Sequence, residues 1–136
     1  MTPADLHAAT LARLQGLTTM NVYDSTVPDS PPANSAGLVF PYVVLWPVPG
    51  NTTEAARNIE ADAAGGLTWD ARVTVASGDP TWTLHALHLV RGRLEGWRIL
   101  PGNQLGEVDT GGMTVQEDTD ITPSRWFTPL QFRTYI

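Results

Sequence analysis

The segment 67–77, LTWDARVTVAS, constrains the fold more than any other part of the chain. Its residues alternate between apolar and polar, which is typical of a β-strand with one packed face and one face toward water or a partner. The apolar set is Leu67, Trp69, Ala71, Val73 and Val75, and the polar set is Thr68, Asp70, Arg72 and Thr74. We therefore expect a strand here with one buried face.

Two segments are predicted to form helices. Thr2 can cap the first, Pro3 suits its first position, and the helix ends near Gly16. The second follows Asp79 and begins with Pro80. At about 100° per residue, one broad arc of the second helix collects its apolar side chains. These are Trp82, Ala86, Leu87, Leu89, Val90, Leu94 and Trp97, whereas Leu84, His85, His88, Arg91 and Glu95 fall outside. This pattern indicates a helix lying on a sheet.

Further strands are predicted at 20–23, 42–48, around 113–117 and at 125–136. The nearly continuous apolar run at 42–48 suits a strand that is covered on both faces. Pro129 would remove a ladder hydrogen bond, so it predicts an edge position or a bulge. Together the segments predict one α+β domain over 1–136, a mostly antiparallel sheet with two main helices packed on one face.

Two segments are predicted to be extended loops or arms. Residues 24–39 include Pro28, Pro31 and Pro32 and precede the apolar strand. Proline restricts the free loop, so ordering it against a neighbouring subunit would cost little entropy; an ordinary surface loop is the alternative. Residues 50–66 are small, polar and bounded by glycine, with Ile59 as their one large apolar side chain. Such a long excursion usually indicates function or disorder.

Composition excludes several classes of function. The 136 residues carry 14 acidic and 8 basic side chains, for a net charge of −6, which argues against a nucleic-acid-binding surface. The chain has no cysteine, so disulfides, thiolate zinc sites and cysteine nucleophiles are excluded. The N-terminal residues lack the apolar core of a signal peptide, and no window approaches the roughly 20 apolar residues of a membrane helix. We therefore expect an intracellular, soluble protein.

The candidate metal sites are weak. His85 and His88 are three residues apart, whereas the zinc-protease helix spaces its histidines four apart around a glutamate. Surface or interface histidines are the favoured interpretation. The acidic turn Glu117–Asp120, taken with Glu107 and Asp109, lacks the glycine and the spacing of a calcium-binding loop. A solvated turn is favoured there, and electrostatic contact with a partner is the alternative.

No catalytic motif is present. No serine lies in a G-x-S-x-G elbow, and no glycine-rich loop has the pattern that holds phosphates. Trp69 and Trp82 could stack on a base or sugar, but both occupy core-facing positions and are predicted to be buried. We therefore expect a protein that is not an enzyme and that uses no cofactor or metal.

Taken in order, the segments resemble the tail terminator (tail completion) proteins of long-tailed bacteriophages. The resemblance is carried by the N-terminal helix, VYDSTVPDSPP followed by FPYVVLWP, WDARVTVAS followed by PTWTLHALHLVRGRLEGW, and VQEDTDITPSRWFTPLQFRTYI. It covers nearly the whole chain, and residues 50–66 match least.

The resemblance implies a ring, usually of six copies, at the head-proximal end of the tail tube. Such a ring stops tube polymerisation and joins the tail to the head. The implied partners are further copies of the chain, the major tail tube protein and a head-completion protein. DNA would pass through the lumen without specific binding, and no membrane is involved. The implied location is the virion, and the host cytoplasm during assembly.

A ring that closes by head-to-tail contacts needs two different complementary patches on each subunit. The candidate contact residues are Pro28, Pro31, Pro32, Ile59, Thr68, Asp70, Arg72 and Pro129. Another neck protein, such as a head-closure or minor tail protein, is the alternative within virions. A small-molecule-binding or hydrolytic domain would require a pocket with convergent polar groups, for which the sequence gives no sign. A cellular interaction module is a further alternative.

Overall fold

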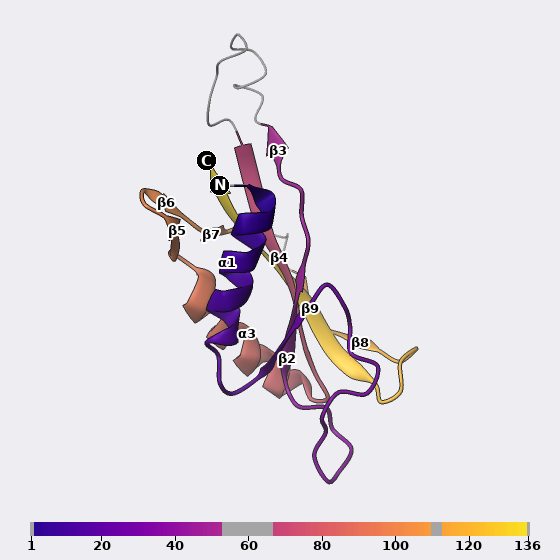
Figure 1. The fold of residues 1–136 in the computed structure, drawn as a ribbon. Helices are drawn as coiled ribbons and strands as arrows, with labels where there is room; N and C mark the ends of the chain where they lie inside the picture. The colour runs from indigo at the N-terminus through magenta and orange to yellow at the C-terminus, as the bar shows by residue number, and fades with distance from the viewer. Residues whose placement is uncertain (1, 53–66, 110–112, 136) are drawn as a thin grey trace.

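The centre of the molecule is the pairing of its two longest strands (Figure 1). In the computed structural model, which describes residues 2–52, 67–109 and 113–135, β4 (Leu67–Ser77) and β9 (Arg125–Tyr135) run antiparallel. The main sheet has the order β1-β2-β4-β9-β7. Its other members are β1 (Asn21–Asp24), β2 (Tyr42–Trp46), β7 (Gly106–Glu107), β3 (Asn51–Thr52) beside β4, and β8 (Gln116–Asp118) beside β9. A small second sheet pairs β5 (Arg98–Leu100) with β6 (Asn103–Gln104).

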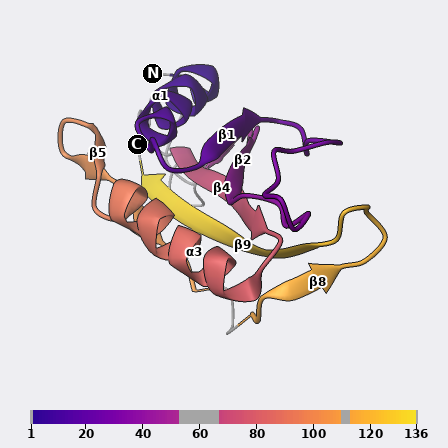
Figure 2. The same ribbon diagram turned by 90° about the horizontal axis from the view of Figure 1, so that it is seen from below.

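Two helices, α1 (Pro3–Gln15) and α3 (Pro80–Leu94), pack on one face of this sheet (Figure 2). Thr2 and Asp5 form a reciprocal capping box on α1, in which the Thr2 hydroxyl accepts from the Asp5 amide and the Asp5 carboxylate accepts from the Thr2 amide. Asp79 caps α3 by accepting a 2.7 Å hydrogen bond from the Thr81 amide. The predicted α+β architecture is confirmed, and β1, which runs parallel to β2, is the exception to the antiparallel order.

The main core lies between the helices and the inner face of the sheet. Trp69, Val73 and Phe132 are buried there, together with Leu6, Leu14, Leu87, Val90 and Leu94 from the helices. Burial of each large apolar side chain contributes roughly 1.5–3 kcal/mol. Trp69 is fully buried as predicted, whereas Trp82 is only half-buried and stacks on exposed Phe40, with 6.4 Å between the ring centroids.

Strand β2 is covered on both faces, which confirms the interpretation of its apolar run. Val43 and Leu45 join the main core, whereas Tyr42 and Val44 join a second cluster on the opposite face with Val39 and Ala76. The acidic turn predicted at 117–120 is partly wrong, because Glu117 and Asp118 belong to strand β8, paired with Trp126 and Arg125. Within the described residues, neither helix is long and apolar enough to cross a membrane.

Candidate functional site

The outer face of the sheet, opposite the helices, falls into two halves along the β4–β9 ladder. The strand registers place Trp46, Arg72 and Gln131 in one row, and Asp70 beside Arg133 in the next. We call this end, with Thr68 and Pro129, the open half. The other end carries Tyr42, Val44, Ala76, Arg125 and Phe127, and we call it the clamped half.

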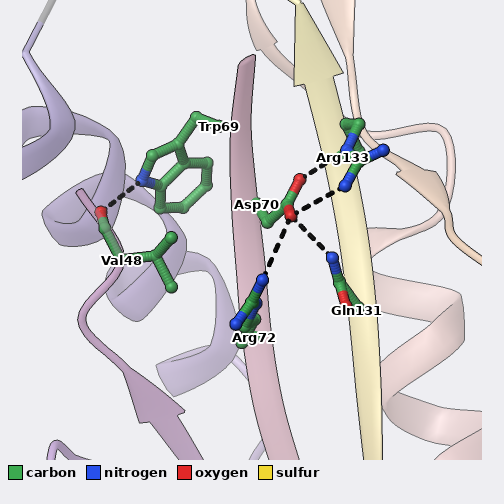
Figure 3. Close-up of polar contacts among 6 residues, drawn as sticks. All are labelled: Val48, Trp69, Asp70, Arg72, Gln131 and Arg133. Atoms are coloured by element: carbon green, nitrogen blue, oxygen red, sulfur yellow. Dashed lines mark hydrogen bonds and ion pairs between the residues drawn. The ribbon is translucent and has the colours of Figure 1, made fainter. Parts of the chain in front are cut away.

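Asp70 organises the open half (Figure 3). Arg133 donates to both of its carboxylate oxygens, from Nε at 2.7 Å and from Nη2 at 3.1 Å. The Gln131 amide donates at 2.6 Å, and Nη2 of Arg72 lies 3.8 Å away. Asp70 lies on the outer face of β4, as the alternation predicts, but it is only 4% exposed and is therefore shielded from water. Its charge is buried because three neighbouring side chains surround it.

The charge state of Asp70 follows from these contacts. Burial by itself raises the pKa of Asp70, but the hydrogen bonds and positive charge of Arg133, with Gln131 and Arg72, outweigh it, so the pKa is lowered. The same ion pair raises the pKa of Arg133 above its ordinary value. The pair is bidentate, and this geometry holds both side chains in fixed orientations.

A groove of about 430 Å³ runs beside this cluster. Arg72, Pro129 and Met113 line it with Trp46 and Gln131, and Met113 is 51% exposed. Pro129 stands opposite Thr74 without a register shift, and β7 and β8 pair with β9 on either side of it, at 132–133 and at 125–127. Within the described residues Pro129 therefore occupies an edge segment, as its missing amide hydrogen predicted.

Arg125 organises the clamped half. Its Nη1 donates to the carbonyl of Pro28 at 2.7 Å and to the Tyr42 hydroxyl at 3.2 Å, and its Nη2 donates to the carbonyl of Asp29 at 3.2 Å. These bonds clamp the start of the 24–39 segment, which we call the arm, onto its own sheet. Pro31 is buried in the clamped segment. No pattern in the sequence identifies Arg125, because its partners lie almost a hundred residues earlier.

The rest of the arm forms a short hairpin over residues 32–40. The amide of Phe40 donates to the carbonyl of exposed Pro32 at 3.0 Å, and Ala33 bridges to Val39. The Gly78 amide donates to the carbonyl of Val39, and a Cβ at Gly78 would lie 2.5 Å from the Val39 nitrogen, so only glycine permits this contact. The hairpin is thus fixed to the domain while the side chains of Leu38 and Phe40 remain exposed.

The remaining predicted residues are not gathered in one place. Thr68 is half-buried opposite Tyr135, and Ile59 lies outside the described residues. His85 and His88 are exposed on α3, and no group of three potential metal ligands occurs in the described part of the chain. The predicted acidic patch is not one cluster. Glu107 lies on β7 and forms an ion pair with Arg91 of α3 at 2.8 Å. Strand β7 pairs with one end of β9, whereas β8, which carries Glu117 and Asp118, pairs with the other end.

A further groove, of about 580 Å³, lies where α1 meets β1, and no sequence pattern predicted it. His7 Nε2 lies 2.7 Å from Asp24 Oδ1, and the Ser25 hydroxyl donates to the same oxygen at 2.7 Å. Both contacts lower the pKa of Asp24, and the hydrogen bond from Ser25 has the larger effect. Because the Ser25 hydroxyl bonds to the aspartate and not to the histidine, the three residues do not form a nucleophilic relay.

Comparison with known proteins gives no family for this chain. A scan against models of protein families found no match, and a search of curated proteins found no significant similarity. On the outer face of the sheet, the polar contacts of Asp70 hold the side chains of Arg133 and Gln131 in place.

Proposed function

We propose that the chain is a structural virion protein that forms a ring at the head-proximal end of a phage tail tube. In this role it ends tube polymerisation and provides the surface on which the head joins the tail. The order of its sequence segments, which resembles that of tail terminator proteins, supports this role. The observation that carries the proposal is the open half of the outer face, a partly exposed surface on which Asp70 fixes the side chains of Arg133 and Gln131.

A surface of this kind lowers the cost of association. Side chains that are immobilised before binding lose less conformational entropy at an interface, and arginine and tryptophan are enriched in interfaces. Arg72 and Trp46 both line the groove of the open half. A ring closed by head-to-tail contacts needs a second, different patch, and the 32–40 hairpin with exposed Leu38 and Phe40 supplies a candidate.

The charge of the chain fits the same role. Each copy carries a net charge of −6, so a ring of copies would be strongly negative. Negative charge on a lumen wall repels the phosphates of DNA, which suits a conduit through which DNA passes without being held.

Tail length in the virus that encodes the chain tests the proposal. Without the chain, tails should be abnormally long and variable, and purified chain should bind the major tail tube protein and form rings visible by negative-stain microscopy. Tails of normal length that lack heads would instead indicate a head-closure protein. Tails and particles indistinguishable from the wild type would contradict the proposal.

A pair of charge variants separates the open half from the rest of the surface. Arg72→Glu places a negative charge beside the groove, and we expect it to prevent assembly while the chain still folds. His88→Glu introduces the same side chain on the exposed side of α3, with a smaller change in charge, and should assemble as the wild type does. Equal loss of assembly in both variants would show that the open half has no special role.

A further inference from the structure

A cavity of about 190 Å³ lies in the clamped half of the outer face. Its walls are mostly apolar and include Val27 from the arm and Ile121, which follows β8. Its charged groups are Asp118 and Arg125. The rest of the lining consists of Val44, Trp46, Thr74, Ala76, Phe127 and the phenol of Tyr42. We call it the clamp cavity.

Arg125 is a buried cation whose charge is not neutralised. It is 2% exposed, and no carboxylate lies within 4.0 Å of its nitrogens in the described part of the chain. Its acceptors are two backbone carbonyls and one phenol, and its Nε is buried without any acceptor. A buried charge of this kind is costly unless a partner compensates it.

The unpaired Nε–H of Arg125 lies on the edge of the guanidinium that can pair with a carboxylate. The Nε–H and one Nη2–H of arginine point the same way and together accept a carboxylate side-on. On Arg125 the Nε has no acceptor, and Nη2 holds only the 3.2 Å bond to the carbonyl of Asp29. A carboxylate is a stronger acceptor for arginine than a neutral carbonyl, so it could take this edge.

Asp118 does not supply that carboxylate. It stands opposite Arg125 in the β8–β9 ladder and lines the same cavity, but its Oδ1 accepts from the Asp120 amide at 3.1 Å. Asp118 is half-exposed, so water screens its charge more than the charge of buried Arg125. The potential in the cavity is therefore dominated by the guanidinium.

We propose that the clamp cavity binds a carboxylate attached to an apolar group. The apolar group fills the space between Val27 and Ile121, and the carboxylate pairs side-on with Arg125. The same chemistry is offered by a free small acid and by an acidic residue beside an apolar one in a partner polypeptide. Because the carboxylate displaces the carbonyl of Asp29, binding also loosens the clamped part of the arm. The proposal does not depend on the assembly of a ring.

Titration of the ¹⁵N-labelled full-length chain by NMR tests this site. Phenylacetate should shift the Arg125 Nε–H signal and the amide signals of residues 27–31, with a dissociation constant on the order of 1 mM, as expected for so small a ligand. Phenylacetamide has the same shape without the charge and should bind about tenfold more weakly. The peptide acetyl-Phe-Glu-amide distinguishes the sources. Binding tighter than that of phenylacetate indicates a polypeptide ligand, and weaker binding indicates a free acid.

Three variants complete the test. Arg125→Met should abolish binding of phenylacetate, whereas Asp118→Asn should tighten it roughly threefold because it removes a partly screened like charge. Glu117→Gln removes the neighbouring charge, which does not line the cavity, and should change little. If Arg125→Met fails to fold, the Asp118→Asn result still decides. Equal binding of acid and amide, weaker binding to Asp118→Asn, or no binding of any probe would overturn the proposal.

Discussion

Asp70 and Arg125 are buried charges at opposite ends of one sheet face, and the chain surrounds them differently. Asp70 receives two hydrogen bonds from Arg133 and one from Gln131, with Arg72 nearby. Arg125 donates only to neutral acceptors, and its Nε has no acceptor. The first charge is neutralised within the domain, and the second is not.

The difference separates two ways of building a surface. A charge neutralised by a bidentate partner fixes its neighbours and has little left to offer a ligand. A charge held by neutral dipoles fixes a segment of backbone, here Pro28 and Asp29, and still favours a stronger acceptor. Under the two proposals made above, the open half is therefore suited to rigid contact, and the clamped half to a ligand that changes its surroundings.

The largest effect is expected for Arg133→Met. This change leaves Asp70 buried with Gln131 and a distant Arg72, and unpaired buried carboxylates are strongly destabilising. Because about a third of the Arg133 side chain is exposed, we expect a loss of about 2–3 kcal/mol in the free energy of unfolding, below the full range for buried pairs. Urea denaturation measures it. The double variant Asp70→Asn with Arg133→Met should lose less than the single variant, and the opposite order would contradict the role given to Asp70.

A smaller effect is expected for Arg125→Met. The change removes the donors of the Pro28 and Asp29 carbonyls and of the Tyr42 hydroxyl, but it also removes an uncompensated buried charge. We expect a loss of about 1–2 kcal/mol, with faster amide hydrogen exchange and proteolysis confined to the arm. If Arg125→Met is as destabilising as Arg133→Met, the contrast between the two charges is wrong.

The pH dependence of the free energy of unfolding should reveal the contribution of the Asp70 ion pair. Its pKa in the folded chain is below the ordinary value of 3.8, so its stabilising contribution is present above that value and is lost as the pH falls through the folded pKa. The wild type should therefore lose more free energy of unfolding between pH 5 and pH 3 than Asp70→Asn does. Because the pKa of Asp24 is also lowered, the free energy of unfolding of the Asp70→Asn variant should still fall somewhat over this pH range. Identical slopes in the two chains would show that the Asp70 ion pair contributes nothing.

The fold was predictable from local patterns. Three patterns can each be recognised within a short stretch of sequence. They are the alternation over 67–77, the helix caps Thr2 and Asp79, and the apolar arc of the second helix. These patterns predicted the two helices and the longer strands, whereas the short strands β3, β5, β6 and β7 were not predicted. The patterns depend on period and on capping, which are properties of neighbouring residues.

The candidate sites were predictable only in part. Arg72 and Pro129 were expected at a surface and do line one groove. The burial of Asp70 was missed because Arg133 lies 63 residues away, and the role of Arg125 was missed because its acceptors are backbone carbonyls. Every residue has a backbone carbonyl, so residue types do not indicate which carbonyls accept these bonds. The register that brings these groups together is set by the whole β4–β9 ladder.

The smallest effect on stability is expected for Arg72→Ala. Its guanidinium is exposed and lies 3.8 Å from Asp70, and exposed pairs at such distances contribute little. We expect a loss below about 0.5 kcal/mol, and a double-mutant cycle should give a coupling of Arg72 to Asp70 well below that of Arg133 to Asp70. A coupling as large as that of Arg133 would mean that Arg72 belongs to the buried network. With a small coupling, loss of assembly in Arg72→Glu is attributable to the open half as a contact surface and not to unfolding.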